Sequence, residues 1–490
     1  NDKISGVNGA LYGKVWPGYA AFPDFTNEDA VEWWVKAIDE FNEEVNFDGI
    51  WLDMNEVANF CTGPCIPEDV VPYQDSLKSK LVYQPGGADI EEKSLSIDGV
   101  HKGGSELDLH SLFGFLQGVA TNKYFENDKK RPFIIARSTF AGQGKYTSHW
   151  NGDNHSTFQY LKLSITGIMN MNLYGMNFNG ADICGFLEET TPELCQKWTN
   201  VGAFYPFARN HDDIHNEGQE FYRFEDDVQA TMINAVRWRY AFLRYFYTQL
   251  YINNIHGGMF WKPLFFEFPD ESAAYENIEK NVMIGSAIKF SPLLDEGNIK
   301  TQGFTFPAGT WCNLIDYKCF TNKKTATQNL NVQPSNLNLH LRMGYIIPFQ
   351  RNSIEQGVVT TEGLKDIPMG IVINVDTNTK KAEGEFFADD GVTLNNPNNL
   401  FILFEFDFSE KDKAILTLIP IHAQYKNTYT NLETIEILAA KGAGLNKFTK
   451  INIDGRKEVT GNYVSGKDLL TFNLGDKEDM QNIKEIVFTK

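Results

Sequence analysis

The sequence predicts an α/β domain with parallel strands, followed by all-β structure. Over residues 1–275, short apolar strands alternate with amphipathic helices, which is the pattern of parallel βα units. From about residue 276 onward, short strand-like runs are bounded by Gly, Pro and Asn, as in one or two antiparallel β-sandwiches. Polar residues follow the apolar runs of the first part, where a (β/α)8 barrel carries its catalytic groups.

The first expected helix covers residues 26–45. Thr26 and Asp29 form a capping box, and apolar residues recur behind them at helical spacing. A compact apolar strand, DGIWLDMNE, follows at 48–56. In order along the chain, we then expect a helix over 110–125, a strand over 131–140, a short element carrying HWNGDN at 149–154, a helix over 157–170, a strand over 173–182 and an aromatic-rich helix from Glu225 to about Ile255.

Four polar residues stand at or just after the ends of strand-like runs: Asp53, Arg137, Asp153 and Asp182. A (β/α)8 barrel places its catalytic groups at the carboxyl ends of its strands, so this placement favours a barrel. A doubly wound sheet is the alternative architecture. No glycine-rich phosphate loop follows any of these strands, which disfavours that alternative.

The chain is acidic, with 44 Lys and Arg against 64 Asp and Glu and a formal net charge of −20. Nucleic acids and anionic membranes bind basic surfaces, so neither is expected as a partner. No apolar run reaches the roughly 18 residues of a membrane span, so none is expected. The chain opens on NDKISGVNG, without an initiator Met or a signal-peptide pattern, which predicts a processed or truncated product.

The six cysteines fall into three close pairs: Cys61 and Cys65, Cys184 and Cys195, and Cys312 and Cys319. Zinc ligation is one interpretation, but no pair has CxxC spacing and no histidines cluster beside a pair. Three local disulfides in an oxidising compartment are therefore favoured.

Hydrolysis of a glycosidic bond needs two acidic side chains in different environments. One carboxylate attacks or stabilises the anomeric carbon, and a protonated acid expels the leaving oxygen. Asp53 alone could be a structural carboxylate. It is followed directly by Met54, Asn55 and Glu56, however, and a polar group of this density at the end of an apolar strand needs a ligand, a metal or a network to compensate for its desolvation.

The segment WLDMNEVANF (51–60) closely resembles the nucleophile signature of glycoside hydrolase family 31. The resemblance implies that Asp53 attacks the anomeric carbon and that Glu56 supports it as a nearby acid. A second segment, ARSTFAGQGKYTSHWNGDN (136–154), resembles the family's other signature, which implies that Asp153 is the general acid/base. The sequon at Asn154 falls inside this signature, so we expect it to be unmodified.

The same resemblance assigns the remaining pocket residues. Arg137 matches an arginine that binds the sugar and steadies the charge of the nucleophile. Each other residue has an ordinary structural alternative, such as a core aromatic or a satisfied histidine. The expected sugar-pocket residues are Trp16, Trp51, Met54, Trp150, Asp182, Phe186 and His211, together with Arg137.

The resemblance covers essentially the whole chain and implies a retaining α-glucosidase that acts on terminal α-1,4-linked glucose by double displacement. Its two carboxyl groups are expected to lie about 5–6 Å apart. A related transglucosylase or α-xylosidase is the alternative within the enzyme class. A non-catalytic carbohydrate-binding homologue, or an inert fragment, is the alternative outside it. No cofactor and no metal are implied.

Family members begin with an N-terminal β-sandwich and the first barrel strands, whereas Trp16 already matches the loop before the nucleophile strand. The resemblance therefore implies the C-terminal part of a (β/α)8 barrel over 1–275. A proximal β-sandwich over 276–351, ending in the strand GYIIPFQ, and a distal β-sandwich over 352–490 should follow. We expect a non-covalent N-terminal partner chain from the same precursor and a lysosomal or secreted location, and Cys184–Cys195 matches a disulfide of such members.

Overall fold

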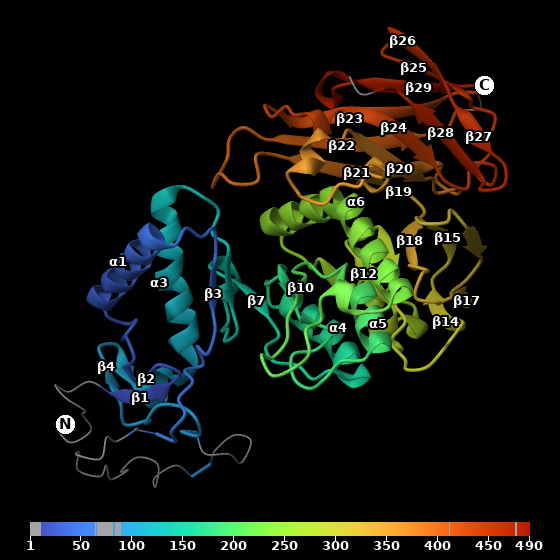
Figure 1. Ribbon diagram of the computed structural model, residues 1–490. Helices are drawn as coiled ribbons and strands as arrows, with labels where there is room; N and C mark the ends of the chain where they lie inside the picture. The colour runs from blue at the N-terminus through green and yellow to red at the C-terminus, as the bar shows by residue number, and fades with distance from the viewer. Residues whose placement is uncertain (1–10, 64, 66–81, 84–89, 411, 476–477) are drawn as a thin grey trace. The chain divides into compact units, whose positions relative to one another are not determined.

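The computed structural model describes residues 11–63, 65, 82–83, 90–410, 412–475 and 478–490. The opening segment NDKISGVNG lies outside these residues. The chain forms two compact units, which are visible in Figure 1. The first comprises the described residues up to Trp150 together with Val392–Leu394, and the second comprises the rest.

Three parallel strands lie in the first unit, in the order β3-β6-β7. They are β3 (Ile50–Leu52), β6 (Ile134–Ala136) and β7 (Ser148–Trp150). Leu52 pairs with Ala136, and Ala136 pairs with His149 on the other side. The three residues of β6 are all buried, as the apolar runs of a parallel sheet predict. The predicted parallel arrangement is therefore confirmed for these strands.

Two helices, α1 (Glu28–Glu44) and α3 (Phe113–Asp128), pack against each other in the first unit (Figure 1). The predicted cap of α1 is wrong by one residue, because the Asn27 side chain accepts the hydrogen bond from the Asp29 backbone N–H. The Thr26 hydroxyl instead accepts from the Gly103 N–H and donates to the Asp24 carboxylate. The other elements of this unit are β1 (Tyr12–Val15), β2 (Gly18–Ala21), β4 (Val100–His101), β5 (Gly104–Ser105) and α2 (Glu106–Leu109).

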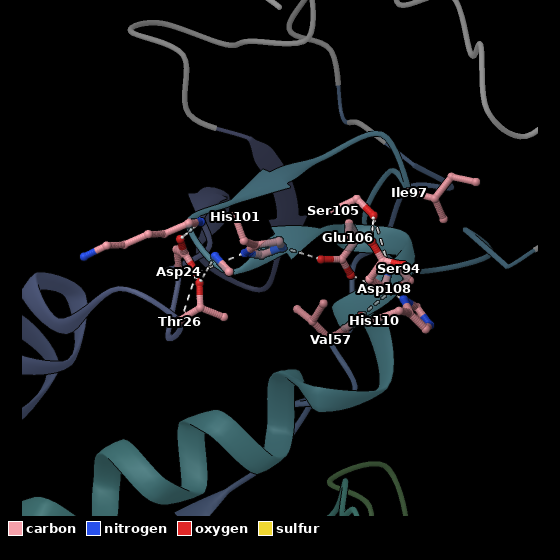
Figure 2. Close-up of polar contacts among 12 residues, drawn as sticks. Asp24, Thr26, Val57, Ser94, Ile97, His101, Ser105, Glu106, Asp108 and His110 are labelled. Atoms are coloured by element: carbon pink, nitrogen blue, oxygen red, sulfur yellow. Dashed lines mark hydrogen bonds and ion pairs between the residues drawn. The ribbon is translucent and has the colours of Figure 1, made fainter.

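Glu106, which begins α2, is a buried carboxylate between two histidines (Figure 2). Its oxygens lie 2.6 Å from His101 Nε2 and 3.3 Å from His110 Nδ1. The other ring nitrogen of His101 lies 3.2 Å from Asp24 Oδ1. Because both ring nitrogens of His101 face carboxylates, only the imidazolium can donate to both. This ion cluster joins the turn before α1 to the segment before α3.

The hydrogen bond with Glu106, opposed by burial, raises the pKa of His101 above its ordinary value. Burial alone would raise the pKa of Glu106, but the hydrogen bonds from His101 and His110 lower it. Both shifts favour the charged forms of the two groups.

The second unit begins with helices that alternate with short strands. A pair of parallel strands, β9 (Asp182–Ile183) and β10 (Arg209–Asn210), lies among them. The strand expected over 173–182 is shorter than predicted, because α4 extends to Leu173 and strand geometry begins only at Asn179. The remaining elements are α4 (Phe158–Leu173), β8 (Asn179–Gly180), α5 (Pro192–Gly202) and α6 (Asp226–His256).

An antiparallel sheet of six strands follows, in the order β11-β12-β13-β18-β15-β16. The strands β14 and β17 form a separate antiparallel ribbon, and a core that includes Phe304, Phe306 and Trp311 is buried between these elements. The bounds are β11 (Trp261–Pro263), α7 (Leu264–Glu267), β12 (Val282–Ile284), β13 (Ile288–Phe290), β14 (Thr301–Phe306), β15 (Gly309–Asn313), β16 (Cys319–Asn322), β17 (Ala326–Asn331) and β18 (Leu339–Arg342).

The C-terminal part is a sheet of eleven strands, in the order β26-β25-β29-β23-β22-β21-β19-β20-β24-β28-β27. Helix α6 packs against β19 and β21 of this sheet (Figure 1). The bounds are β19 (Tyr345–Phe349), α8 (Asn352–Glu355), β20 (Met369–Asn374), β21 (Lys381–Ala388), β22 (Leu400–Asp407), β23 (Ala414–Ala423), β24 (Leu432–Ile437), β25 (Lys450–Ile453), β26 (Lys457–Thr460), β27 (Asn462–Val464), β28 (Leu469–Asn473) and β29 (Glu485–Thr489).

Two features of this sheet differ from the expected sandwiches. The strand GYIIPFQ, expected as the last strand of the proximal sandwich, pairs as β19 with β20 and β21 in the larger sheet. Two pairings, β19 with β21 and β20 with β24, are parallel and not antiparallel. The domain limits at 275 and 351 stay predictions.

The three cysteine pairs are joined as disulfides, which removes the zinc interpretation. Among the helices of the described ranges, none combines the length and the apolar character needed to cross a membrane.

Candidate active site

Asp53 is the first residue after β3, and its carboxylate is one-third exposed. Its Oδ1 accepts a hydrogen bond of 2.8 Å from the backbone N–H of Met54. Met54 has a φ of 57°, a left-handed conformation that non-glycine residues adopt rarely and that clusters at functional sites. The chain therefore turns sharply at the end of the strand and leaves the carboxylate accessible.

Arg137 stands at the matching position after β6, so the Leu52–Ala136 pairing brings it beside Asp53. Its guanidinium lies 3.0 Å from Asp53 Oδ1. It also donates two hydrogen bonds to Glu56, of 2.8 and 3.1 Å. One arginine thus fixes both acids of the WLDMNE motif through charge-assisted contacts. It also contacts the Met54 sulfur.

The expected aromatic residues of the first unit form two edge-to-face pairs. Trp51 and Trp150 lie 5.3 Å apart, with Trp51 exposed and Trp150 buried. Trp16 lies in the turn between β1 and β2, is 70% exposed and packs on Phe60 at 4.8 Å. Trp16 and Trp51 therefore present open ring surface of the kind that stacks on sugars, and Trp150 supports Trp51 from below the surface.

Asp153 belongs to the second unit, where it is exposed in a turn after a left-handed Gly152. The next residue, Asn154, is buried and holds this turn in place. Its Nδ2 donates to the Asp182 carbonyl at 3.0 Å, and its Oδ1 accepts from the Phe186 N–H at 2.9 Å. Both ends of this amide are occupied, which supports the expectation that the sequon is unmodified.

Asp182 is 1% exposed and forms an ion pair with Arg209 at 2.8 Å. The two residues are directly paired across the parallel strands β9 and β10. Arg209 was not among the residues predicted from the sequence. Two features of the sequence could have pointed to Arg209. It lies two residues before His211, and a carboxylate such as Asp182, once buried, needs a cation as its partner. Asp182 is thus buried against Arg209, and its expected contact with a sugar stays a prediction.

Phe186 and His211 stack on each other, with ring centroids 4.9 Å apart. The loops that carry these two rings are rich in acidic residues, and the backbone N–H of Glu217 binds the Glu189 carboxylate. Burial, followed by the charges of Glu220, Glu189 and Asp213, raises the pKa of Asp212. The loops after β9 and β10 therefore carry an excess of negative charge beside the stacked rings.

The predicted residues form one group within each unit. In the first unit Asp53, Met54 and Glu56 all contact Arg137, and the two tryptophan-containing pairs lie in that unit as well. The turn of Asp153 is tied to Asp182 and Phe186 in the second. The short separation of Asp53 and Asp153 stays a prediction.

Comparison with known proteins matches the model of the glycosyl hydrolases family 31 TIM-barrel domain to residues 3–249. The model of the glycosyl hydrolase family 31 C-terminal domain matches residues 257–347. Lysosomal alpha-glucosidase of Mus musculus is 37% identical over 402 residues, which cover 78% of this chain and 41% of the mouse protein. Alpha-xylosidase 1 of Arabidopsis thaliana is 32% identical over 505 residues, which cover 96% of this chain and 53% of the plant protein.

The fold is also similar to a solved structure, that of a glucosidase II alpha subunit. The TM-score is 0.82 at 22% identity, over 98% of this chain and 50% of that one. The chain thus spans about half the length of the proteins that it matches, or somewhat less.

Proposed function

Because the chain belongs to family 31 of the glycosyl hydrolases, we propose that it carries the two catalytic carboxylates of a retaining α-glucosidase. Asp53 is the nucleophile and Asp153 the general acid/base. The observation that carries the proposal is the contact of Arg137 with Asp53 at the end of β3, inside the nucleophile signature. A carboxylate held beside a fixed cation is suited to attack as an anion.

The reaction is a double displacement. Asp53 attacks the anomeric carbon of a terminal α-glucosyl unit while Asp153 donates a proton to the departing oxygen. Asp153 then accepts a proton from water, which hydrolyses the β-glucosyl-enzyme and releases glucose with its configuration retained. Arg137 and Glu56 keep Asp53 in place, and the exposed rings of Trp16 and Trp51 border the sugar.

Hydrolysis of an α-glucoside is favoured because the mouse relative is named a lysosomal alpha-glucosidase, and the α-1,4 linkage is proposed from the resemblance of the WLDMNE motif. A second candidate is an α-xylosidase, since the plant relative that covers nearly all of the chain carries that name. Comparison of a p-nitrophenyl α-glucoside with the matching α-xyloside distinguishes the two. Faster release of nitrophenol from the glucoside supports the proposal. Faster release from the xyloside would show that the preferred substrate is an α-xyloside and not an α-glucoside.

The barrel of the active enzyme is proposed to include strands from a further N-terminal segment. The family's barrel domain matches residues 3–249, and this chain spans 41% of the mouse relative. We propose that the segment is a non-covalent partner chain from the same precursor. Denaturing electrophoresis and N-terminal sequencing of the natural protein test this, and a single unprocessed polypeptide would contradict the two-chain form.

A lysosomal or secreted location fits two observations. Three disulfides need an oxidising compartment, and the mouse relative is lysosomal by name. Localisation of the tagged full-length protein in its native cell tests this, and a purely cytosolic signal would overturn it.

The decisive assay measures glucose released from maltose and from the aryl α-glucoside at acidic and neutral pH, by the chain with and without the N-terminal segment. We expect turnover with the segment present and none after Asp53→Ala. Turnover retained in Asp53→Ala would refute the assignment of the nucleophile.

A further inference from the structure

We infer that two buried amides, Asn55 and Gln143, position Arg137 by holding the backbone N–H and the backbone carbonyl of Ser138. The inference rests on the proposed role of Asp53, because Arg137 is the cation beside that carboxylate. Both amides lie in the first unit, on the loops that follow β3 and β6.

Asn55 is 1% exposed, and its Oδ1 accepts a hydrogen bond of 2.9 Å from the Ser138 N–H. The preceding N–H, that of Arg137, donates to the Leu52 carbonyl at 3.1 Å. The end of β6 is therefore tied to the nucleophile strand and then to the motif itself. The Nδ2 of Asn55 has no hydrogen-bond partner among the described residues. The side chain therefore acts on the loop through its oxygen, Oδ1, which accepts from Ser138.

Gln143 is fully buried and binds the other side of the same residue. Its Nε2 donates to the Ser138 carbonyl at 3.3 Å and to the Thr147 hydroxyl at 3.0 Å. Its Oε1 accepts from the Phe140 N–H at 3.0 Å. A buried glutamine is stable only when its polar atoms are paired, and here both ends are used to order the loop that carries Arg137.

The first turn of α3 limits the movement of this arrangement. A Cβ on Gly114 would lie 2.6 Å from the Asn55 carbonyl oxygen and 2.8 Å from the Ser138 Cβ, so the helix backbone is packed directly against both. Ser138 can therefore move little while its two hydrogen bonds exist. The position of a guanidinium depends on the backbone that carries it. Restricting the movement of Ser138 therefore helps to keep the Arg137 side chain in contact with Asp53 and Glu56.

A double-mutant cycle tests this inference in the enzyme that contains the full chain. Asn55→Leu and Gln143→Leu are each made in the wild type and in Arg137→Met, and Gln117→Leu serves as the matched amide control on α3. We expect each loop variant to lower kcat/KM by about 10- to 100-fold in the wild type. In Arg137→Met the further loss should be below about 3-fold, because the group that was positioned is absent.

Equal losses in both backgrounds, or no loss in the wild type, would overturn the inference. Gln117→Leu is expected to change kcat/KM by less than about 2-fold, because it removes an amide that does not touch Ser138. If Asn55→Leu does not fold, Gln143→Leu tests the same residue through its backbone carbonyl.

A second measurement keeps this inference separate from the proposed function, since an inactive wild type would refute only the latter. Isotope-labelled arginine allows the Nε–H signal of Arg137 to be followed by NMR. We expect a resolved, slowly exchanging signal in the wild type and in Gln117→Leu. It should broaden and exchange faster in Asn55→Leu and in Gln143→Leu, and an unchanged signal in both would show that the amides do not position Arg137.

Discussion

Oδ1 of Asp53 accepts from the Met54 N–H and also faces the Arg137 guanidinium, so two groups hold this carboxylate in place. Asp153 lies in an exposed turn whose neighbours Gly152 and Asn154 provide backbone shape and anchorage. One carboxylate is thus held against a fixed cation and the other lies in an exposed turn, a contrast that suits two carboxyl groups with different tasks.

Asp153→Ala tests the proton-transfer role. Turnover of maltose should fall by about 10²- to 10⁴-fold, because the leaving hydroxyl then departs unprotonated. The aryl glucoside should show a burst of nitrophenol followed by slow turnover, since nitrophenolate leaves without a proton while water still lacks its base. Stopped-flow absorbance measures the burst, and Asp39→Ala on the exposed side of α1 is the control. Maltose turnover at the wild-type rate would exclude Asp153 as the general acid.

Arg209→Met tests the ion pair behind the second group. Asp182 is almost fully buried, so loss of the guanidinium should lower the free energy of unfolding by about 3 kcal/mol. Urea unfolding followed by circular dichroism measures the change. A difference below about 0.5 kcal/mol would mean that the pair contributes little to stability.

The sequence could group Trp51, Asp53, Met54 and Glu56 in one continuous motif and Arg137, Trp150 and Asp153 in another, whereas the other candidates lie outside these motifs. Arg209 was missed because its partner is 27 positions away, and no pattern within a motif reveals a pairing across two strands. Asn55 was visible in the motif, but its hydrogen bond to Ser138 spans 83 positions and depends on the register of β3 with β6.

At the scale of elements, periodicity predicted which segments form helices and strands better than it predicted their ends or partners. The cap of α1 shifted to Asn27 because the Thr26 hydroxyl is used by Asp24 and Gly103. The strand Tyr345–Phe349 was predicted, but its sheet was not, because the sequence of an apolar strand does not reveal which strands it pairs with. It pairs with β20 and β21.

The cluster of His101 and Glu106 predicts a pH-dependent contribution to stability. The raised pKa of His101 stabilises the fold at pH values below 6.5, the ordinary pKa of histidine. This stabilisation is lost as the pH rises through the pKa of His101 in the folded protein. The lowered pKa of Glu106 stabilises the fold above 4.5, and that benefit disappears as pH falls through its folded pKa. The contribution is therefore largest between pH 4.5 and 6.5.

His101→Gln should lower the free energy of unfolding by about 1.5–3 kcal/mol within that window and by less at alkaline pH. Urea unfolding at a series of pH values measures this, with the exposed His422→Gln as the matched control. A loss that is the same at every pH would show that His101 is not charged in the folded protein.

His340 predicts the opposite pH dependence in the six-stranded sheet. It is buried beside Phe306 and Phe320, and burial, with the charge of Lys289, lowers its pKa to about 3. Between pH 6.5 and about 3 the unfolded chain binds a proton that the folded chain does not, so acid destabilises the fold.

His340→Leu should remove a slope of up to about 1.4 kcal/mol per pH unit in that range. Unfolding experiments at matched pH values measure the slope. An unchanged slope would place the acid sensitivity elsewhere in the chain.

At the scale of the whole molecule, the order of an α/β part followed by β-sheets could be predicted, because helical and strand periodicities differ along the chain. The number of strands per sheet could not, since pairing between distant segments is decided by side-chain packing that no local pattern records. The formal charge of −20 on the chain is consistent with a sugar as ligand in place of a polyanion.

As the proposed nucleophile, Asp53 should form a covalent bond to the sugar. A fluorinated glucosyl fluoride traps the intermediate of a retaining enzyme, because it slows the second step more than the first. After proteolysis and mass spectrometry, we expect one fluoroglucosyl unit on the peptide that contains Asp53, and none in Asp53→Ala. A label on another residue, or full turnover without any covalent adduct, would contradict the assignment of Asp53 as the nucleophile.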